Sequence, residues 1–315
     1  MMRERMWSLT PMADCPVHST LSIGPIAADH LRERVQRGSV AAVFSSVFYV
    51  RLPGGLVCVT NADVEDGPIS VRANMSRDWQ RAGLILGQPV ALAHPHLRIA
   101  GLLSLDLATA RVWHPEIVVS GAVQRPEGLA LRQLDARLAG RGTLPGLGAL
   151  LGASGQPQPG DAVLGRAAVQ IDAARNWMTT ALRGAPQCAP DWAVSLLGYG
   201  AGLTPSGDDV LGGMLIALHA TGHGAVARAL WQDIAPHLAT RTNRISAALL
   251  TASADGLGSA SVHDAIAALL RFDVDGLDRA LVAIDRIGHS SGWDTLLGVV
   301  TVLDALTASP DQRAA

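Results

Sequence analysis

The chain has 315 residues, of which 49% are hydrophobic and only 17% are charged, and its formal net charge is −2. This composition excludes a disordered chain, and the absence of a dense basic stripe argues against a nucleic-acid partner. The length is typical of one large domain or of two domains of ordinary size. The high hydrophobic content is also compatible with a homo-oligomer.

All 25 basic residues are Arg, and the sequence contains no Lys. The absence of Lys excludes Schiff-base chemistry on a lysine and the phosphate-binding lysine of P-loops. The cysteines Cys15, Cys58 and Cys188 are far apart and form no CxxC motif, which indicates a reduced cytoplasmic protein. The most apolar stretch, 210–227, is interrupted by Gly and His, so we expect a buried helix there and no contact with a membrane.

Residues 1–125 are expected to form a β-rich domain. Short runs of β-branched and aromatic residues alternate with Gly, Pro, Asn and Asp, a pattern typical of a small barrel or sandwich. Helical periodicity interrupts the pattern twice, at 29–37 and 79–86. The predicted strands are 40–52, 56–60, 69–73, 90–93, 98–105 and 117–123.

The pattern changes after Pro126. A helix is predicted at 127–139, and the Gly- and Pro-rich stretch 140–160 is expected to be a linker or a long mobile loop, so residues 126–160 connect two domains. Residues 161–315 are helical almost throughout, with helices predicted at 161–183, 208–221, 225–238, 242–254, 261–270, 277–287 and 293–306. The predicted fold class is therefore α+β: a β-rich barrel or sandwich followed by an all-α domain.

The segment 197–211 carries the most unusual motif, with Gly198, Gly200 and Gly202 at alternate positions. Thr204, Ser206 and Gly207 follow and lead into an apolar helix. Alternating glycines permit unusual backbone conformations, and a helix N-terminus offers unpaired N–H groups that attract anions. We therefore predict a binding site for a small anionic substrate at this helix end.

Part of this motif is repeated near the C-terminus, because 206–213 and 291–298 share Ser, Gly, Asp, Leu and Gly at equal spacing. We expect both helix starts to face one cleft, with His289 beside the second start. A polar cluster at 242–246 opens another helix. The predicted substrate-binding residues are Gly198, Gly200, Gly202, Thr204, Ser206, Gly207, Thr242, Asn243, Ser246, Ser290, Ser291 and Gly292. The alternative is that each Ser-x-x-Asp merely caps its own helix.

The carboxylates Asp208 and Asp209 would repel a phosphate at the same helix end. Either Mg²⁺ bridges them, since oxygen ligands suit that ion, or they accept hydrogen bonds from an amide or ureido group. No cofactor is required by the sequence, and Asp208 and Asp209 are the Mg²⁺ ligands if that ion is present. Arg51, Arg72 and Arg98 lie on predicted strands, where exposure is the ordinary expectation and binding of a carboxylate across the domain cleft is the alternative.

The motifs at 198–209, 242–246 and 288–294 resemble those of the AllH family, named for a subunit of the bacterial oxamate carbamoyltransferase of allantoin breakdown. The resemblance implies a partner-dependent enzyme that works beside two other subunits. Such a complex interconverts oxalurate and phosphate with oxamate and carbamoyl phosphate. It therefore implies carbamoyl phosphate or oxamate as the small anionic substrate.

From the residues, we predict His289 as the proton donor or acceptor and Asp208, Asp209 and Asp294 as further catalytic groups. No covalent nucleophile is evident, so electrostatic positioning would supply most of the rate. Two alternatives remain at this stage. One is a stand-alone Mg²⁺-dependent hydrolase of a phosphorylated or ribosylated substrate, and the other is a non-catalytic scaffold or ligand-sensing subunit.

Overall fold

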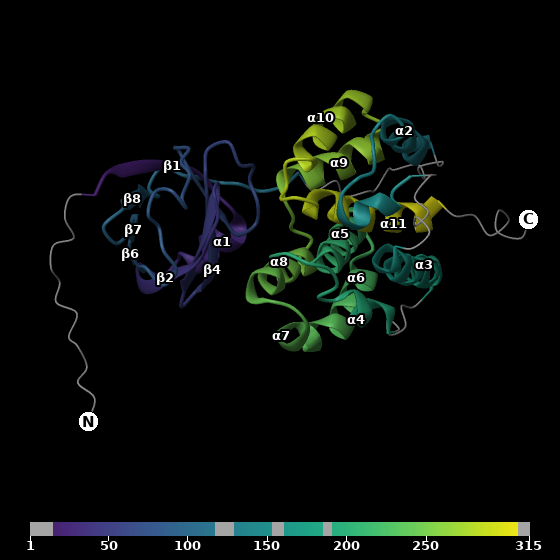
Figure 1. The fold of residues 1–315 in the computed structure, drawn as a ribbon, viewed down its shortest axis with the longest axis horizontal. Helices are drawn as coiled ribbons and strands as arrows, with labels where there is room; N and C mark the ends of the chain where they lie inside the picture. Colours follow the sequence, from purple (N-terminus) through teal and green to yellow (C-terminus); the bar gives the residue numbers. More distant parts are fainter. Residues whose placement is uncertain (1–14, 117–128, 153–160, 185–190, 308–315) are drawn as a thin grey trace, which may run out of the picture. The chain divides into compact units, whose positions relative to one another are not determined.

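A computed structural model describes residues 15–116, 129–152, 161–184 and 191–307 (Figure 1). The chain divides into two compact units, Met1–His114 and Pro115–Ala315, each with its own hydrophobic core. The first unit is built of strands and the second of helices, which confirms the predicted α+β class. Within the described ranges, no helix has the length and apolar character needed to cross a bilayer.

The first unit is a closed β-barrel. Its strands follow the order β5-β4-β3-β2-β6-β7-β8-β1, and an antiparallel pairing of β1 with β5 closes the ring, while β9 extends the sheet beside β1. Fully buried Phe48 and Trp79 meet edge to face in its core. The elements are β1 Val17–Ile23, α1 Pro25–His30, β2 Val35–Val43, β3 Val47–Leu52, β4 Gly55–Thr60, β5 Ser70–Ala73, β6 Pro89–Ala93, β7 His96–Ile99, β8 Leu103–Asp106 and β9 Arg111–Val112.

Several predicted elements of the barrel are wrong in detail. The expected strand 40–52 is an antiparallel hairpin of β2 and β3, and 98–105 is divided into β7 and β8 by a turn at Gly101, whose φ is +70°. Periodicity misled the two helix predictions. The region 29–37 ends helix α1 and begins strand β2, and 79–86 consists of turns around buried Trp79. The predicted strand 117–123 lies outside the described residues.

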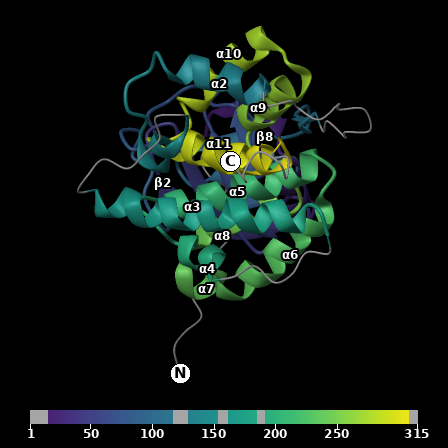
Figure 2. The same ribbon diagram turned by 90° about the vertical axis from the view of Figure 1, so that its right-hand side faces the viewer.

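The second unit is helical, as predicted. Its central helix α5 is buried on nearly every side. This burial explains why the sequence is apolar along this helix. The elements are α2 Leu129–Leu138, η1 Gly146–Leu150, α3 Ala162–Ala181, α4 Trp192–Leu196, α5 Ser206–Ala220, α6 Gly224–Ile234, η2 Ala235–His237, α7 Leu238–Arg241, α8 Arg244–Ala254, α9 Ala260–Arg271, α10 Val274–Ile284 and α11 Ser291–Thr307. Helices α5 and α11 lie side by side in the middle of this unit (Figures 1 and 2).

Part of the segment expected to be a linker is instead packed into the helical core. The short 3₁₀-helix η1 buries Leu147, Gly148 and Leu150. It lies against α11, since a Cβ on Gly148 would stand 2.5 Å from the Cβ of Trp293. Residues 144–151 therefore belong to the helical unit, and 153–160 lie outside the described residues.

Candidate functional site

The two repeated motifs meet where α5 and α11 begin. The Ser206 hydroxyl interacts with the Asp294 carboxyl and opposes the rise of its pKa, and the Ser291 hydroxyl interacts with the Asp209 carboxyl in the same way. Each serine thus interacts with the aspartate of the other repeat. Thr204 joins the pair, with its Oγ1 atom 2.7 Å from Oγ of Ser291. The capping alternative is not realised in α5, whose N-cap Pro205 makes no side-chain cap.

Asp294 is completely buried, and a loop far away in sequence contributes to its binding. Its Oδ1 atom accepts hydrogen bonds from the backbone N–H groups of Leu147 at 2.6 Å and Gly148 at 3.1 Å. Gly146 fits there only because it lacks a side chain, since a Cβ would stand 2.5 Å from Asp294 Oδ1. Sequence reasoning missed this loop. The one available signal was the Gly-x-Gly of residues 146–148 inside a stretch that resembles a linker.

Asp209 and Asp294 each keep one buried carboxylate oxygen, Oδ2, for which no hydrogen-bond partner is found among the described residues. Burial raises the pKa of Asp209 well above its ordinary value, and the nearby charge of Asp294 raises it further, against the lowering effect of Ser291 and Thr204. Burial also raises the pKa of Asp294. A buried acceptor without a partner is unfavourable, so the two oxygens suit either a proton or the N–H groups of a ligand.

Asp208 has different surroundings, although it is adjacent to Asp209 in sequence. Its Oδ1 atom accepts the Gly198 N–H at 2.6 Å, and its Oδ2 atom accepts the hydroxyl of Ser246 at 2.6 Å and that of Thr242. Both oxygens of this buried carboxylate are therefore occupied. The geometry makes Asp208 the residue that ties the glycine loop to the start of α8.

Asn243 reinforces this connection. Its Oδ1 atom caps α8 by accepting the N–H groups of Ile245 at 3.0 Å and Ser246 at 3.1 Å. Its Nδ2 atom donates to the Leu203 carbonyl at 2.6 Å. The cluster 242–246 thus lies next to the glycine loop, as the sequence suggested. Its described contacts hold the loop in place.

The glycine loop differs from the expectation that several free N–H groups surround one point. The N–H of Gly207 donates to the Tyr199 carbonyl at 2.8 Å, and those of Asp208 and Asp209 donate to the Pro205 carbonyl at 2.9 and 3.1 Å. The loop folds back and satisfies its own helix end, so that expectation is wrong for these three groups. For the N–H of Ser206, the described residues provide no acceptor.

Gly200 lies against the backbone nitrogen of Ser206. A Cβ at Gly200 would stand 3.0 Å from this nitrogen, whereas one at Gly202 would meet nothing closer than 3.8 Å. The three alternating glycines all have positive φ, +75° at Gly198, +105° at Gly200 and +111° at Gly202. Gly200 and Gly202 are also exposed. The N–H of buried Ser206 is therefore the one of these helix-start groups that has no acceptor among the described residues.

The turn before α11 places the remaining predicted residues. Ser290 is half-buried and interacts with Asp294, while Gly292 lies against the Ile284 carbonyl oxygen, 2.1 Å from where a Cβ would be. His289 is exposed in this turn, and no hydrogen bond orients its ring within the described part of the chain. Ser290 and Ser291 thus lie at the meeting point of the helices, and His289 lies in the turn beside them.

The arrangement of the site's carboxylates gives little support to a bound metal ion. In the part of the chain that the structure describes, no group of three or more His, Cys, Asp or Glu side chains is arranged to hold a metal. The expected Mg²⁺ ligands Asp208 and Asp209 do not present a shared open face, because both Asp208 oxygens already accept hydrogen bonds. The oxygens without partners belong to Asp209 and Asp294.

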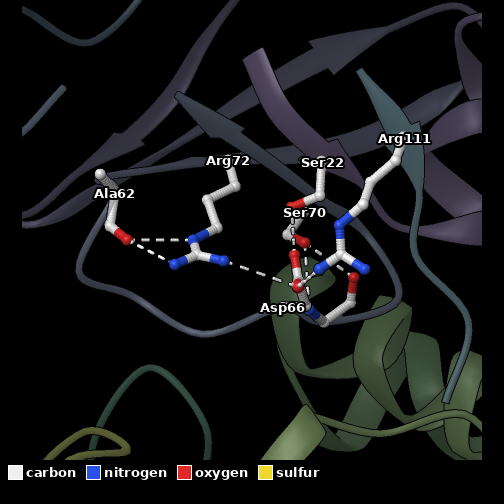
Figure 3. Close-up of polar contacts among 7 residues, drawn as sticks. Ser22, Ala62, Asp66, Ser70, Arg72 and Arg111 are labelled. Carbon is white, nitrogen blue, oxygen red and sulfur yellow. Dashed lines mark hydrogen bonds and ion pairs between the residues drawn. The ribbon is translucent and has the colours of Figure 1, made fainter. Parts of the chain in front are cut away.

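The barrel contains a separate polar cluster around buried Asp66 (Figure 3). Its carboxylate accepts the Ser22 hydroxyl and an Arg111 N–H at 3.0 Å, and Arg72 lies 3.7 Å away. Arg72 also donates two hydrogen bonds to the Ala62 carbonyl, at 3.0 and 2.7 Å. These bonds join the loop after β4 to strands β1, β5 and β9, so the cluster stabilises the barrel.

A closed β-barrel and a helical unit with two cross-paired Ser–Asp motifs define a two-unit α+β protein. The family model described as "Oxamate carbamoyltransferase subunit AllH" matches residues 196–303, and "AllH family N-terminal domain" matches residues 19–112. The chain therefore belongs to the AllH family, and the predicted resemblance is confirmed. The family description names a subunit, which implies a complex of several chains. No match was found among curated proteins or solved structures.

Proposed function

We propose that the chain is a subunit of a carbamoyltransferase complex that acts on oxamate or oxalurate, or on a related small ureido or carboxamide acid, with carbamoyl phosphate. The family description supports the class of reaction. The observation that carries the proposal is the pair of buried Oδ2 atoms on Asp209 and Asp294, which have no hydrogen-bond partner in the described chain although hydroxyl groups surround both carboxyls.

The chemistry of these substrates suits such a pair. Oxamate, oxalurate and carbamoyl phosphate each combine an amide N–H with an anionic oxygen. The Asp209 and Asp294 oxygens would accept the amide hydrogens, while the Ser206 N–H and the hydroxyls of Thr204 and Ser291 would bind the anionic end. Positioning and electrostatic stabilisation would then supply most of the rate.

Two further residues have supporting roles in this proposal. His289 lies in the turn next to Ser290 and would exchange a proton with the substrate, for which its exposed ring is accessible. Asp208 would act as a positioning residue, because its bonds to Gly198, Thr242 and Ser246 fix the loop that carries Thr204. Mg²⁺ is not needed for any of these roles.

The experiment is an assay of the assembled complex. The chain is co-produced with the other two subunits, and phosphate-dependent cleavage of oxalurate is measured with and without EDTA. We expect Asp209→Asn to lower kcat/KM by about 100-fold or more, in the range of lost acid–base or substrate contacts. Asp255→Asn, a matched change at an exposed aspartate of the same unit, should have no effect.

Three outcomes contradict the proposal or part of it. An intact complex that is inactive on every ureido acid tested would favour the non-catalytic alternative. Loss of activity in EDTA, restored by Mg²⁺, would favour the metal-dependent alternative. Full activity of Asp209→Asn would remove this residue from the site.

A further inference from the structure

Three arginines share one outer face of the barrel. Arg37 of β2, Arg51 of β3 and Arg98 of β7 point outward and are exposed, while their strand neighbours fill the core. Strand register places them close together. Arg37 and Arg98 are both paired with Ala91 of β6, and Arg51 is paired with Ser39, two residues from Arg37. Two strand spacings separate Arg37 from Arg98, about 10 Å. We call this surface the arginine face.

The arginine face lacks internal counter-charges. In the described chain, none of Arg37, Arg51 and Arg98 forms an ion pair, whereas four other barrel arginines do: Arg32, Arg72, Arg81 and Arg111. The residues between them on the face are small, so the guanidinium groups are accessible. The nearest acidic residue by strand register is Asp106 of β8. It is paired with His96, which lies two residues from Arg98 on β7, and its carboxylate accepts the N–H of Ala108.

An apolar turn is hydrogen-bonded to β2, the strand that carries Arg37. Ile85 and Leu86 expose 64% and 72% of their surface at the tip of the turn that leads into β6. The turn is held on both sides, because Gln88 N–H donates to the Ile85 carbonyl at 3.2 Å and Gly87 N–H donates to the Val40 carbonyl at 2.9 Å. Two large apolar side chains are thus exposed on a hydrogen-bonded turn, and this turn contacts Val40, which follows Ser39, the residue paired with Arg51.

We propose that the arginine face and the turn at Ile85 and Leu86 form the docking surface for another subunit of the complex. That partner would offer an apolar pocket for the turn, flanked by Asp or Glu side chains for the arginines. The inference rests on the chain being a subunit, as the family description states. The charge of the face supports it, since three guanidinium groups without ion pairs among the described residues favour a partner that offers carboxylates. Arg is also among the residues enriched at protein interfaces and in their hot spots.

A protein partner fits these residues better than a polyanion. Nucleic-acid surfaces depend on many phosphate contacts, whereas this face has three arginines and an adjoining apolar turn. A buried apolar contact with a few charges at its rim matches the anatomy of a protein interface. Nucleic acid and anionic lipid are therefore outcomes that the test must separate from a subunit.

The test measures assembly rather than turnover. The full chain and its variants are titrated with the separately purified other subunits at 0.1 and 0.5 M NaCl. Arg51→Glu with Arg98→Glu should weaken binding at least about tenfold at low salt and remove its salt dependence. Leu86→Asp should weaken binding at both salt concentrations. Arg77→Glu, the same charge change in the exposed loop after β5, should bind like the wild type.

Thermal unfolding verifies that each variant is folded. Wild-type affinity in the double arginine variant and in Leu86→Asp would overturn the proposal, as would failure of the wild-type chain to bind any subunit. Salt-sensitive binding of duplex DNA or phosphatidylserine vesicles, lost in the arginine variant while subunit binding persists, would also overturn it. If the wild-type complex forms but transfers no carbamoyl group, the proposed function fails and the docking surface stands.

Discussion

Gly298 of α11 lies directly against the carbonyl oxygen of Val210 in α5, where a Cβ would stand 2.0 Å from that oxygen. Gly213 makes the equivalent contact with the Thr295 carbonyl, also at 2.0 Å. The four residues occupy equivalent positions of the two repeats, so α5 and α11 pack symmetrically. This contact lies about one turn from Asp209 and Asp294 and brings the two helix starts together.

Gly298→Ala should destabilise the helical unit by about 3 kcal/mol, because a methyl group has no space between the two helices. Gly213→Ala should have an effect of similar size. The matched control is Gly165→Ala in α3, where a Cβ would have no neighbour within 4 Å. There we expect a gain of about 0.5–1 kcal/mol, since Ala favours a helix over Gly. Urea unfolding of the three variants measures the difference.

Asp209→Asn should change how stability depends on pH. The pKa of Asp209 is raised in the folded chain, mainly by burial, so the folded state holds a proton that the unfolded state releases. The stabilisation is complete below the ordinary aspartate pKa of about 4 and is lost as pH rises through the raised pKa.

The free energy of unfolding of the wild type should therefore fall over this interval relative to Asp209→Asn, and urea titrations from pH 4 to pH 8 test this. Asp255→Asn, at an exposed aspartate, should follow the wild type. Parallel curves for the wild type and Asp209→Asn would show that the pKa of Asp209 is ordinary.

The sequence predicted the helical unit well because its helices are long and their apolar periodicity is strong. Asp161 was expected to start a helix, and it caps α3 by accepting the N–H groups of Val163 and Leu164. The barrel was predicted only as a class. Its strands are short, and their pairing is long-range: β1 pairs with β5, β8 and β9. Such partners leave no local signal.

The candidate site was predicted in its parts but not in its connections. The repeat of Ser206 and Asp209 in Ser291 and Asp294 was visible in the sequence. The interaction of each serine with the aspartate of the other repeat was not, because it depends on the packing of α5 against α11. The different surroundings of Asp208 and Asp209 could not be predicted from the sequence either. Adjacent residues point in different directions on a helix, and only the position of α8 decides which one is enclosed.

His263 should make the chain sensitive to mild acid. Burial lowers the pKa of this side chain to about 4, and its Nε2 atom accepts the Gly258 N–H at 3.0 Å, which requires a neutral ring. The folded state thus resists protonation, so stability is complete above the ordinary pKa of about 6.5 and is lost as pH falls towards 4.

The loss attributable to His263 should reach about 3 kcal/mol at the acid end of this range. His263→Gln can still accept a hydrogen bond and should remove that dependence, whereas His237→Gln, at an exposed position, should not. Chemical denaturation between pH 4 and pH 7 provides the comparison. An unchanged pH slope in His263→Gln would assign the acid sensitivity to other groups.

Gly200 and Gly202 allow a direct test of the helix N–H at Ser206. Their φ values, +105° and +111°, are similarly unfavourable for alanine, so both changes to Ala should cost about 1–3 kcal/mol of stability. Only at Gly200 would the new Cβ stand 3.0 Å from the Ser206 nitrogen. If the anionic end of the substrate binds there, Gly200→Ala should raise the KM for oxalurate about tenfold more than Gly202→Ala, the size of one lost hydrogen bond to a charged group. Steady-state kinetics of the assembled complex measure this ratio, and equal KM values for the two variants would place the anion elsewhere.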